Sequence, residues 1–128
     1  MFNDNLARKI ARERFLSESD RRDSPRFDLP VAIRSGNEYR ECFGRLSING
    51  LYFETERRHR LGQRVSARLV LLGLGREIEV QGTVIQIMPA GGQWGVVVRF
   101  DGIPFESERQ IARWLDLMAR ATRVVAVP

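Results

Sequence analysis

Hydrophobic and polar positions alternate through most of the middle of this chain, with the period of two that a half-buried β-strand produces. The alternation is clearest between Trp94 and Phe100, where every second residue is large and apolar. Turn-forming residues separate the alternating segments, as at Ser35–Asn37 and Pro89–Gly92. The pattern therefore predicts six short strands, at residues 27–34, 39–46, 51–54, 63–72, 77–88 and 94–100.

Two residues refine this prediction of strands. Proline has no N–H to donate to a neighbouring strand, so Pro30 indicates either an edge strand or a position near the start of its strand. Beyond Gly82 the order of apolar and polar positions changes phase, and we therefore expect a β-bulge near that glycine.

The C-terminal part of the chain changes from strand to helix periodicity. Ser107 and Gln110 have the spacing of a capping box, which predicts that Ser107 caps the start of a helix. Six closely spaced strands and one terminal helix favour a mainly β fold, a small antiparallel barrel with the helix packed on it or plugging an opening. The apolar residues of the helix follow the spacing i, i+3, i+4 and i+7: Ile111, Trp114, Leu115 and Met118.

Length and composition fit a single domain with one modest core, since the chain has 128 residues and a hydrophobic content of 43%. We expect a flexible charged arm at residues 1–20, a folded domain at 21–122 and a tail at 123–128. No segment approaches the roughly eighteen apolar residues of a membrane span, and the charged N-terminus lacks the apolar centre of a signal peptide. We therefore expect a cytoplasmic protein without membrane insertion.

Arginine dominates the basic residues of the chain. Of 21 basic residues only Lys9 is lysine, and the net charge is +5. The planar guanidinium group suits phosphate and the O6/N7 edge of guanine, which favours an anionic partner, although the codon bias of a GC-rich genome explains the excess more simply. Five arginines form a local cluster that we interpret as a solvated loop and strand face: Arg57, Arg58, Arg60, Arg64 and Arg68.

Several classes of chemistry have no support in the sequence. The single cysteine, Cys42, and the single histidine, His59, cannot form a Cys/His metal cluster. The Gly-x-Ser-x-Gly spacing of a nucleophile elbow is missing, and no pair of carboxylates suggests acid–base catalysis. We expect neither an enzyme nor a bound metal or cofactor, and we assign the aromatic side chains of Trp94, Phe100 and Trp114 to the core.

Two short motifs lie on either side of the first predicted strand pair. The first is Arg22–Arg26, an Arg-x-x-x-Arg segment that Pro25 keeps extended or turned, and the second is Ser47–Gly50, a Ser-x-x-Gly turn. Either motif alone fits ordinary structure, as two arginines in a solvated arm or as an Asn-Gly hairpin turn. Together they can bind a nucleotide, because arginine binds phosphate and stacks on purines, serine donates to phosphate, and glycine permits close approach and positive φ.

In this order the two motifs resemble the PilZ domain, a bacterial receptor family for cyclic di-GMP. The family pattern is Arg-x-x-x-Arg followed by [Asp/Asn]-x-Ser-x-x-Gly, and Arg45 occupies the acidic position, where the family uses an acceptor for guanine N1 and N2. The resemblance covers roughly residues 21–119 and implies a six-stranded antiparallel split β-barrel with a C-terminal α-helix. It also implies a ligand site at Arg21, Arg22, Arg26, Arg45, Ser47, Asn49 and Gly50. Within that site Arg45 can turn to a phosphate or to guanine O6/N7, and the nearby amide oxygen of Asn49 is a candidate substitute acceptor.

The resemblance implies a stand-alone receptor that binds cyclic di-GMP and acts, through an unidentified effector protein, as an adaptor in motility, biofilm or exopolysaccharide control. Arg45 motivates the alternative of a PilZ-like interaction module that does not bind the nucleotide. A barrel that binds single-stranded nucleic acid is a third option. DNA binding is not expected, because the aromatic residues are predicted to be buried and not arrayed for base stacking. We expect a monomer or a homodimer.

Overall fold

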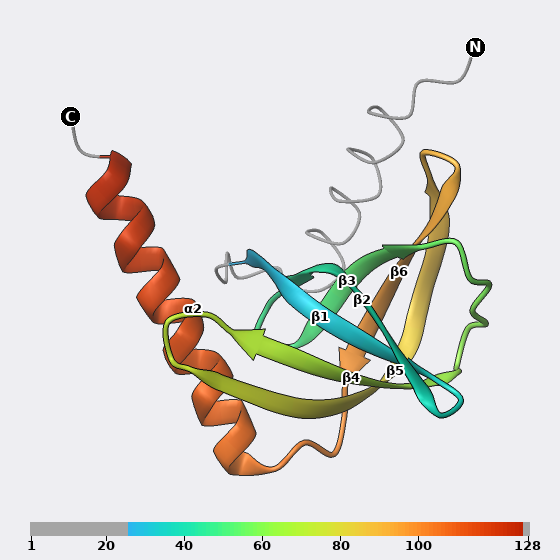
Figure 1. Ribbon diagram of the computed structural model, residues 1–128, viewed down its shortest axis with the longest axis horizontal. Helices are drawn as coiled ribbons and strands as arrows, with labels where there is room; N and C mark the ends of the chain where they lie inside the picture. Colours follow the sequence, from blue (N-terminus) through green and yellow to red (C-terminus); the bar gives the residue numbers. More distant parts are fainter. Residues whose placement is uncertain (1–25, 127–128) are drawn as a thin grey trace.

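Six antiparallel strands close into a barrel, and one helix follows them (Figure 1). The computed structural model describes residues 26–126, with side-chain surroundings through Ala121. Around the barrel the strand order is β1-β2-β3-β6-β5-β4, and the pairing of β1 with β4 closes it. The predicted six-stranded barrel with a C-terminal helix is confirmed. The elements are β1 (Phe27–Ser35), β2 (Glu38–Leu46), β3 (Gly50–Thr55), β4 (Arg64–Leu71), β5 (Arg76–Ala90), β6 (Gln93–Phe100) and α2 (Phe105–Ala126).

The barrel interior contains the residues that the alternation placed on the inward faces of the strands. Leu29 and Val31 of β1 and Val96 and Val98 of β6 are at most 2% exposed, and they belong to one hydrophobic cluster. Burying a large aliphatic side chain stabilises the fold by about 1.5–3 kcal/mol, so these positions account for much of its stability. The aromatic rings at the two ends of β6, Trp94 and Phe100, are partly buried against the same cluster.

Helix α2 covers one end of the barrel. Ile111, Trp114 and Leu115 are at most 3% exposed and belong to the core cluster of the barrel. The indole Nε1 of Trp114 donates a 3.0 Å hydrogen bond to the carbonyl oxygen of Leu72 in the β4–β5 turn. The Trp114 ring meets Phe27 edge-on, with 6.3 Å between ring centroids. Figure 1 shows α2 running beside the β4–β5 turn and projecting past the barrel, and its buried side chains show that the helix is packed on the barrel.

The helix begins earlier than the capping-box pattern predicted. Because α2 starts at Phe105, Ser107 lies inside the first turn and does not cap the helix. The backbone N–H of Glu108 donates to the carbonyl oxygen of Pro104 at 3.0 Å. Glu106 and Glu108 place negative charge at the positive end of the helix dipole, which favours a helix start at this point without a serine cap.

Among the described residues, no helix combines the length and the apolar character needed to cross a bilayer.

The irregularity in β5 lies at Ile85 and not at Gly82. The pairing of β5 with β6 shifts between Val84 and Gln86, which leaves Ile85 as the extra residue of a β-bulge. Gly82 itself is regularly paired with β6. A Cβ on Gly82 would collide with the carbonyl group of Arg99, so the close approach of two backbones explains this glycine.

The outer face of β3, β6 and β5 is also apolar. Tyr52, Met88, Ala90 and Val97 are at most 4% exposed and form a second cluster, separate from the barrel interior. Val97 is the register partner of Tyr52 and lies between the two inward-facing valines of β6. This part of the sheet is therefore buried on both faces. The alternation did not reveal this, because an unbroken run of three valines fits either face.

Strand β1 is joined unequally to its two neighbours. Nine residue pairs connect β1 to β2, whereas only three pairs, at Val31, Ala32 and Ile33, connect β1 to β4. Pro30 lies just before these three pairs, in the part of β1 that pairs with β2 alone. Strand β1 pairs with a neighbour on each side of the closed barrel. Pro30 lies at a position where the β4 side of the strand is unpaired, so its missing N–H costs no hydrogen bond of the ladder.

We expect Cys42 to react slowly with thiol reagents. Its side chain packs against the barrel core, and burial raises the pKa of the thiol to about 11. At pH 8 only about one thiol in a thousand is then the reactive thiolate. Alkylation by iodoacetamide, followed by mass spectrometry, should be far slower in native protein than in urea-unfolded protein. Equal rates in the two states would contradict this burial.

Candidate functional site

The two sequence motifs meet at one end of the β1–β2 ladder. Phe27 of β1 pairs with Leu46 of β2, so Arg26 and Ser47 are the residues directly beyond the last pair on each strand. Arg26 is half-buried at the entrance to β1, and Ser47 begins the β2–β3 turn. Because Phe27 contacts Trp114, this is also the end of the barrel that α2 covers.

The turn from Ser47 to Gly50 is held by its own hydrogen bonds and by β6. The Ser47 N–H donates to the carbonyl oxygen of Gly50 at 3.0 Å, and the Ser47 hydroxyl donates to the same oxygen at 3.4 Å. The carbonyl oxygen of Asn49 accepts a 2.9 Å hydrogen bond from the N–H of Phe100. Ser47 is fully buried and its hydroxyl stabilises the turn, whereas Asn49 is exposed.

Gly50 is required by the contact between β3 and β6. A Cβ on this residue would lie well inside van der Waals contact with the carbonyl oxygen of Val98, and close to the Cα of Arg99. The positive φ that glycine permits is not used here, since Gly50 is not among the glycines of the described residues with positive φ. The sequence predicted a close approach at this glycine, and the group that approaches it is the backbone of β6.

Arg45, which departs from the family pattern, lies at the centre of a three-strand register on the barrel wall. Its partners are Asp28 on β1 and Tyr52 on β3. Together with Glu54 of β3, these residues line a hollow of about 320 Å³. The Nε of Arg45 is buried and has no hydrogen-bond partner among the described residues. A buried donor left unpaired costs about 1–3 kcal/mol, so an acceptor supplied by a ligand would be bound favourably at this point.

A pocket of about 820 Å³ opens beside the β2–β3 turn, within the range of about 300–1,000 Å³ typical of ligand sites. Asn49 and Gly50 line it from the turn, and Ile85 and Val97 line it from β5 and β6. Arg99, the register partner of Gly50, adds an exposed guanidinium group to the lining. The sequence pattern did not indicate Arg99, because β3, β4 and β5 lie between the turn and its strand along the chain.

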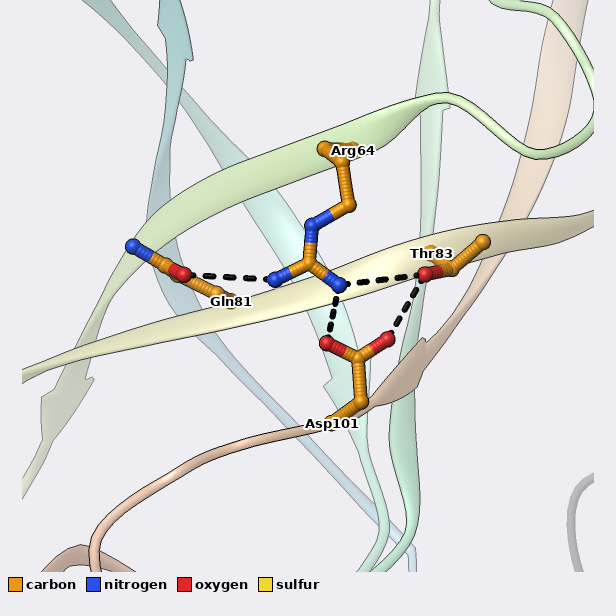
Figure 2. Close-up of polar contacts among 4 residues, drawn as sticks. All are labelled: Arg64, Gln81, Thr83 and Asp101. Carbon is orange, nitrogen blue, oxygen red and sulfur yellow. Dashed lines mark hydrogen bonds and ion pairs between the residues drawn. The ribbon is translucent and has the colours of Figure 1, made fainter.

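A polar cluster fixes the wall of this pocket at the end of β6 (Figure 2). Asp101, which lines the pocket, forms an ion pair with Arg64 of β4 and accepts a 2.6 Å hydrogen bond from the Thr83 hydroxyl of β5. Arg64 also donates to the Thr83 hydroxyl and to the side-chain oxygen of Gln81, each at 3.3 Å. The hydrogen bonds from Thr83 and Arg64 lower the pKa of the Asp101 carboxyl. The ionised carboxylate therefore fastens the segment between β6 and α2 to the barrel.

Two of the candidate ligand residues lie outside the described part of the chain. Arg21 and Arg22 precede residue 26, so Arg26 is the one residue of the Arg-x-x-x-Arg segment that the structure describes. The arm expected at residues 1–20 also lies outside the described residues.

The described residues form no metal site. Within residues 26–126, no three His, Cys, Asp or Glu side chains are grouped so that they could hold a metal ion. His59 lies in the β3–β4 loop, where its ring meets Phe53 edge-on with 5.6 Å between centroids. Its Nδ1 is 3.3 Å from the carbonyl oxygen of Arg57, and the side chain is half-buried. His59 therefore packs as a structural residue of the loop.

Comparison with known sequences gives one family. The sequence profile of the PilZ domain matches residues 20–117, which is more than half of the chain. No curated protein sequence matches the chain at a significant level.

Solved structures show the same fold. The Bacillus subtilis inhibitor of motility MotI/DgrA matches with a TM-score of 0.67 and 16% identity, over 80% of this chain and 52% of its own. A tetrameric PilZ domain from Xanthomonas campestris, self-assembled through a helical bundle, matches with a TM-score of 0.70 and 12% identity, over 89% and 95%. YcgR from Escherichia coli, in complex with c-di-GMP, matches with a TM-score of 0.64 and 19% identity, over 84% and 50%. This chain spans about half the length of MotI and of YcgR.

Proposed function

The chain belongs to the PilZ domain family, and from this membership we propose that it is a cyclic di-GMP receptor that acts as a signalling adaptor. The nucleotide binds where the two motifs meet, between Arg21, Arg22 and Arg26 on one side and the β2–β3 turn with Arg45 on the other. Bound nucleotide joins the segment before β1 to the barrel and so changes the surface offered to an effector protein. The process controlled is motility, biofilm formation or exopolysaccharide production.

The observation that carries this proposal is the register of β1 and β2. The register puts Arg26 beside Ser47, at the end of the barrel where the 820 Å³ pocket opens. Cyclic di-GMP has two phosphodiester charges and two guanines. Arginine suits both, because its planar guanidinium forms bidentate hydrogen bonds with phosphate and stacks on aromatic bases. Arg99 supplies a further cation in the pocket.

The edge of guanine needs an acceptor that Arg45 cannot supply. Asp28 is exposed, lies directly across the β1–β2 pair from Arg45, and lines the same hollow. We assign the acceptor role to the carboxylate of Asp28, which accepts from guanine N1 and N2, and a phosphate-binding role to Arg45. In this arrangement an acid on β1 takes the role that the family pattern gives to the acidic position on β2, and the unpaired Nε of Arg45 gains an acceptor.

Two relatives support separate parts of the proposal. YcgR is known in complex with c-di-GMP, which supports the choice of ligand. MotI is an inhibitor of motility, which supports a role in that process. Their sequence identities to this chain, 19% and 16%, establish a common fold, so the ligand and the process are proposals here.

The receptor proposal predicts saturable binding of cyclic di-GMP that depends on Arg26 and Asp28. Titration calorimetry should show binding by the wild-type chain and a roughly tenfold or greater loss of affinity in Arg26→Ala and in Asp28→Asn, since hydrogen bonds to charged groups contribute about 1.5–3 kcal/mol. Arg22→Ala should show a similar loss. The control is Arg76→Ala, which removes an exposed arginine at the start of β5. Absence of saturable binding to the wild type, or equal affinities in all variants, would reject the receptor.

A second candidate function is a PilZ-type interaction module that does not bind the nucleotide. Two observations favour it: Arg45 occupies the acidic position, and Ser47 is fully buried. Arg45→Asp separates the two candidates. The receptor loses affinity, because a phosphate ligand disappears and a second acid faces Asp28, whereas the interaction module gains nucleotide binding that the wild-type chain lacks.

A further inference from the structure

The end of the barrel away from α2 has a second pocket, of about 580 Å³. Its walls come from the β1–β2 hairpin and from the β3–β4 loop, residues 56–63. Figure 1 shows the hairpin and the loop together at this end, across the barrel from the helix. Neither Arg26 nor the Ser47–Gly50 turn lines this pocket, although it shares Cys42, Glu54 and Gln93 with the hollow at Arg45.

Arginine side chains give this pocket its chemistry. Arg34, Arg40, Arg57 and Arg58 all line it, and none of the four is ion-paired with a carboxylate of residues 26–126. The hairpin holds two of them: Arg57 donates to the hydroxyl of Ser35, and the Nε of Arg34 donates 3.1 Å to the carbonyl oxygen of Gly36. A guanidinium group has five N–H donors, so each of these two arginines keeps donors for a ligand. We call this pocket the arginine mouth.

The β3–β4 loop presents its arginines on an ordered backbone. The N–H of Arg57 donates to the hydroxyl of Thr55 at 3.1 Å, and the N–H of Arg60 donates to the side-chain oxygen of Gln63 at 2.9 Å. The N–H of Gln63 donates back to the carbonyl oxygen of Arg60 at 3.0 Å. Binding at this loop therefore avoids much of the entropy cost of ordering a mobile segment, which a merely solvated loop would carry.

We propose that the arginine mouth binds a short acidic segment of a partner protein. Carboxylates of such a segment pair with the four arginines, which lack acidic partners among the described residues. The proposal rests on the adaptor function proposed above, since it assigns the effector a surface at the opposite end of the barrel from the nucleotide motifs. A nucleotide at one end and a protein at the other can then be bound at the same time.

The composition of the mouth favours a peptide over a nucleic acid. Three glutamates line the same pocket, and they repel a continuous phosphate backbone, whereas a peptide can set its own donors against them. The aromatic rings are also occupied: Phe53 is 1% exposed, and the guanidinium of Arg58 lies 5.9 Å from the ring centroid of Trp94. The ring of His59, which also lines the pocket, packs edge-on against Phe53, so these three described rings do not form a free surface for stacking on a base, as single-strand binding requires. The glutamates are Glu41, Glu54 and Glu56.

A fluorescence anisotropy titration of the full chain with a fluorescein-labelled hexaglutamate peptide, without nucleotide, tests this inference. We expect saturable binding, weakened about tenfold or more in the double variant Arg34→Glu with Arg57→Glu. Arg40→Glu, which removes no hydrogen bond described in the hairpin or loop, should weaken binding in the same direction and guards against misfolding of the double variant. The matched control carries the same charge change at exposed arginines elsewhere, Arg76→Glu with Arg113→Glu, and should bind nearly as the wild type does.

Three results would overturn the inference. They are no binding of the peptide by the wild-type chain, equal weakening in the mouth variants and the control, and displacement of the peptide by an oligothymidine that binds more tightly to the same arginines. Because the titration contains no cyclic di-GMP, its failure leaves the calorimetry with that nucleotide unaffected. Failure of nucleotide binding likewise leaves the peptide result intact.

Discussion

The Gly50→Ala variant is expected to lose about 3 kcal/mol of folding free energy, near the upper end of the cost of adding an atom to a filled site. The added Cβ meets the carbonyl oxygen of Val98, and a backbone atom of a paired strand cannot turn aside as a flexible side chain can. Relief requires β3 and β6 to separate at the Gly50–Arg99 end of their ladder of six residue pairs. The glycine of the Ser-x-x-Gly motif is therefore needed for folding whether or not a ligand binds.

Urea unfolding measures this loss, and Gly92→Ala is its control. Gly92 has a φ of 84° and open space around its Cβ position, so alanine there costs only the backbone strain of about 1–2 kcal/mol. A Gly50→Ala variant as stable as Gly92→Ala, or more stable, would contradict the steric argument. If Gly50→Ala folds at low temperature, its affinity for cyclic di-GMP per folded molecule separates a ligand contact from a purely structural role.

Replacing Trp114 by alanine is expected to cost about 4 kcal/mol, within the range of 3–5 kcal/mol for deleting a buried aromatic side chain. The indole is 1% exposed, packs edge-on against Phe27, and donates its Nε1 hydrogen to the carbonyl oxygen of Leu72. These contacts join α2 to the start of β1 and to the β4–β5 turn. Their loss leaves a cavity at the barrel end and detaches the helix.

Trp114→Phe is the matched comparison. Phenylalanine keeps most of the buried ring but leaves the carbonyl oxygen of Leu72 without its donor, which costs about 1–3 kcal/mol. Trp94 remains as a fluorescent reporter of unfolding in both variants. If Trp114→Ala were as stable as the wild-type chain, the helix would not be part of the barrel's cooperative unit.

The alternation of apolar residues predicted the fold because each half-buried strand turns every second side chain inward. This information was lost where the pattern fits two orientations. The valine run 96–98 is buried on both sides, and only the pairing of Tyr52 with Val97 shows which side belongs to the second cluster. The disturbed phase in β5 was visible, but its location at Ile85 depends on the register with β6, a strand that the alternation cannot align.

The candidate site was predictable only where its residues are close in sequence. The motif Ser47–Gly50 is local, so its spacing is visible, but a turn has no periodicity to show that the Ser47 hydroxyl is buried. Asp28 lies near the site because it pairs with Arg45, and Arg99 because it pairs with Gly50. The sequence alone does not predict which residues of two strands pair with each other.

The capping pattern at Ser107 failed for a related reason. Its spacing is also compatible with the interior of a first helical turn, and the acidic residues at Glu106 and Glu108 favour an earlier start. The arginine cluster of the β3–β4 loop and β4 is exposed, as predicted from the sequence. Its proximity to Arg34 arises only when the β1–β2 hairpin folds beside that loop.

Only three residue pairs join β1 to β4, and only three join β2 to β3. The short Ser47–Gly50 turn ties β2 to β3, whereas no turn connects β1 to β4, so the β1–β4 pairing is the part of the barrel wall that is held least. Local unfolding of a protein begins where the fewest hydrogen bonds must break. The barrel should therefore open between β1 and β4 into an open sheet, while β1 stays paired with β2. Amide hydrogens at Val31–Ile33 would then exchange with solvent sooner than those of the β4–β5 ladder. A ligand that binds Arg26, one residue before β1, would stabilise the closed barrel and slow that exchange.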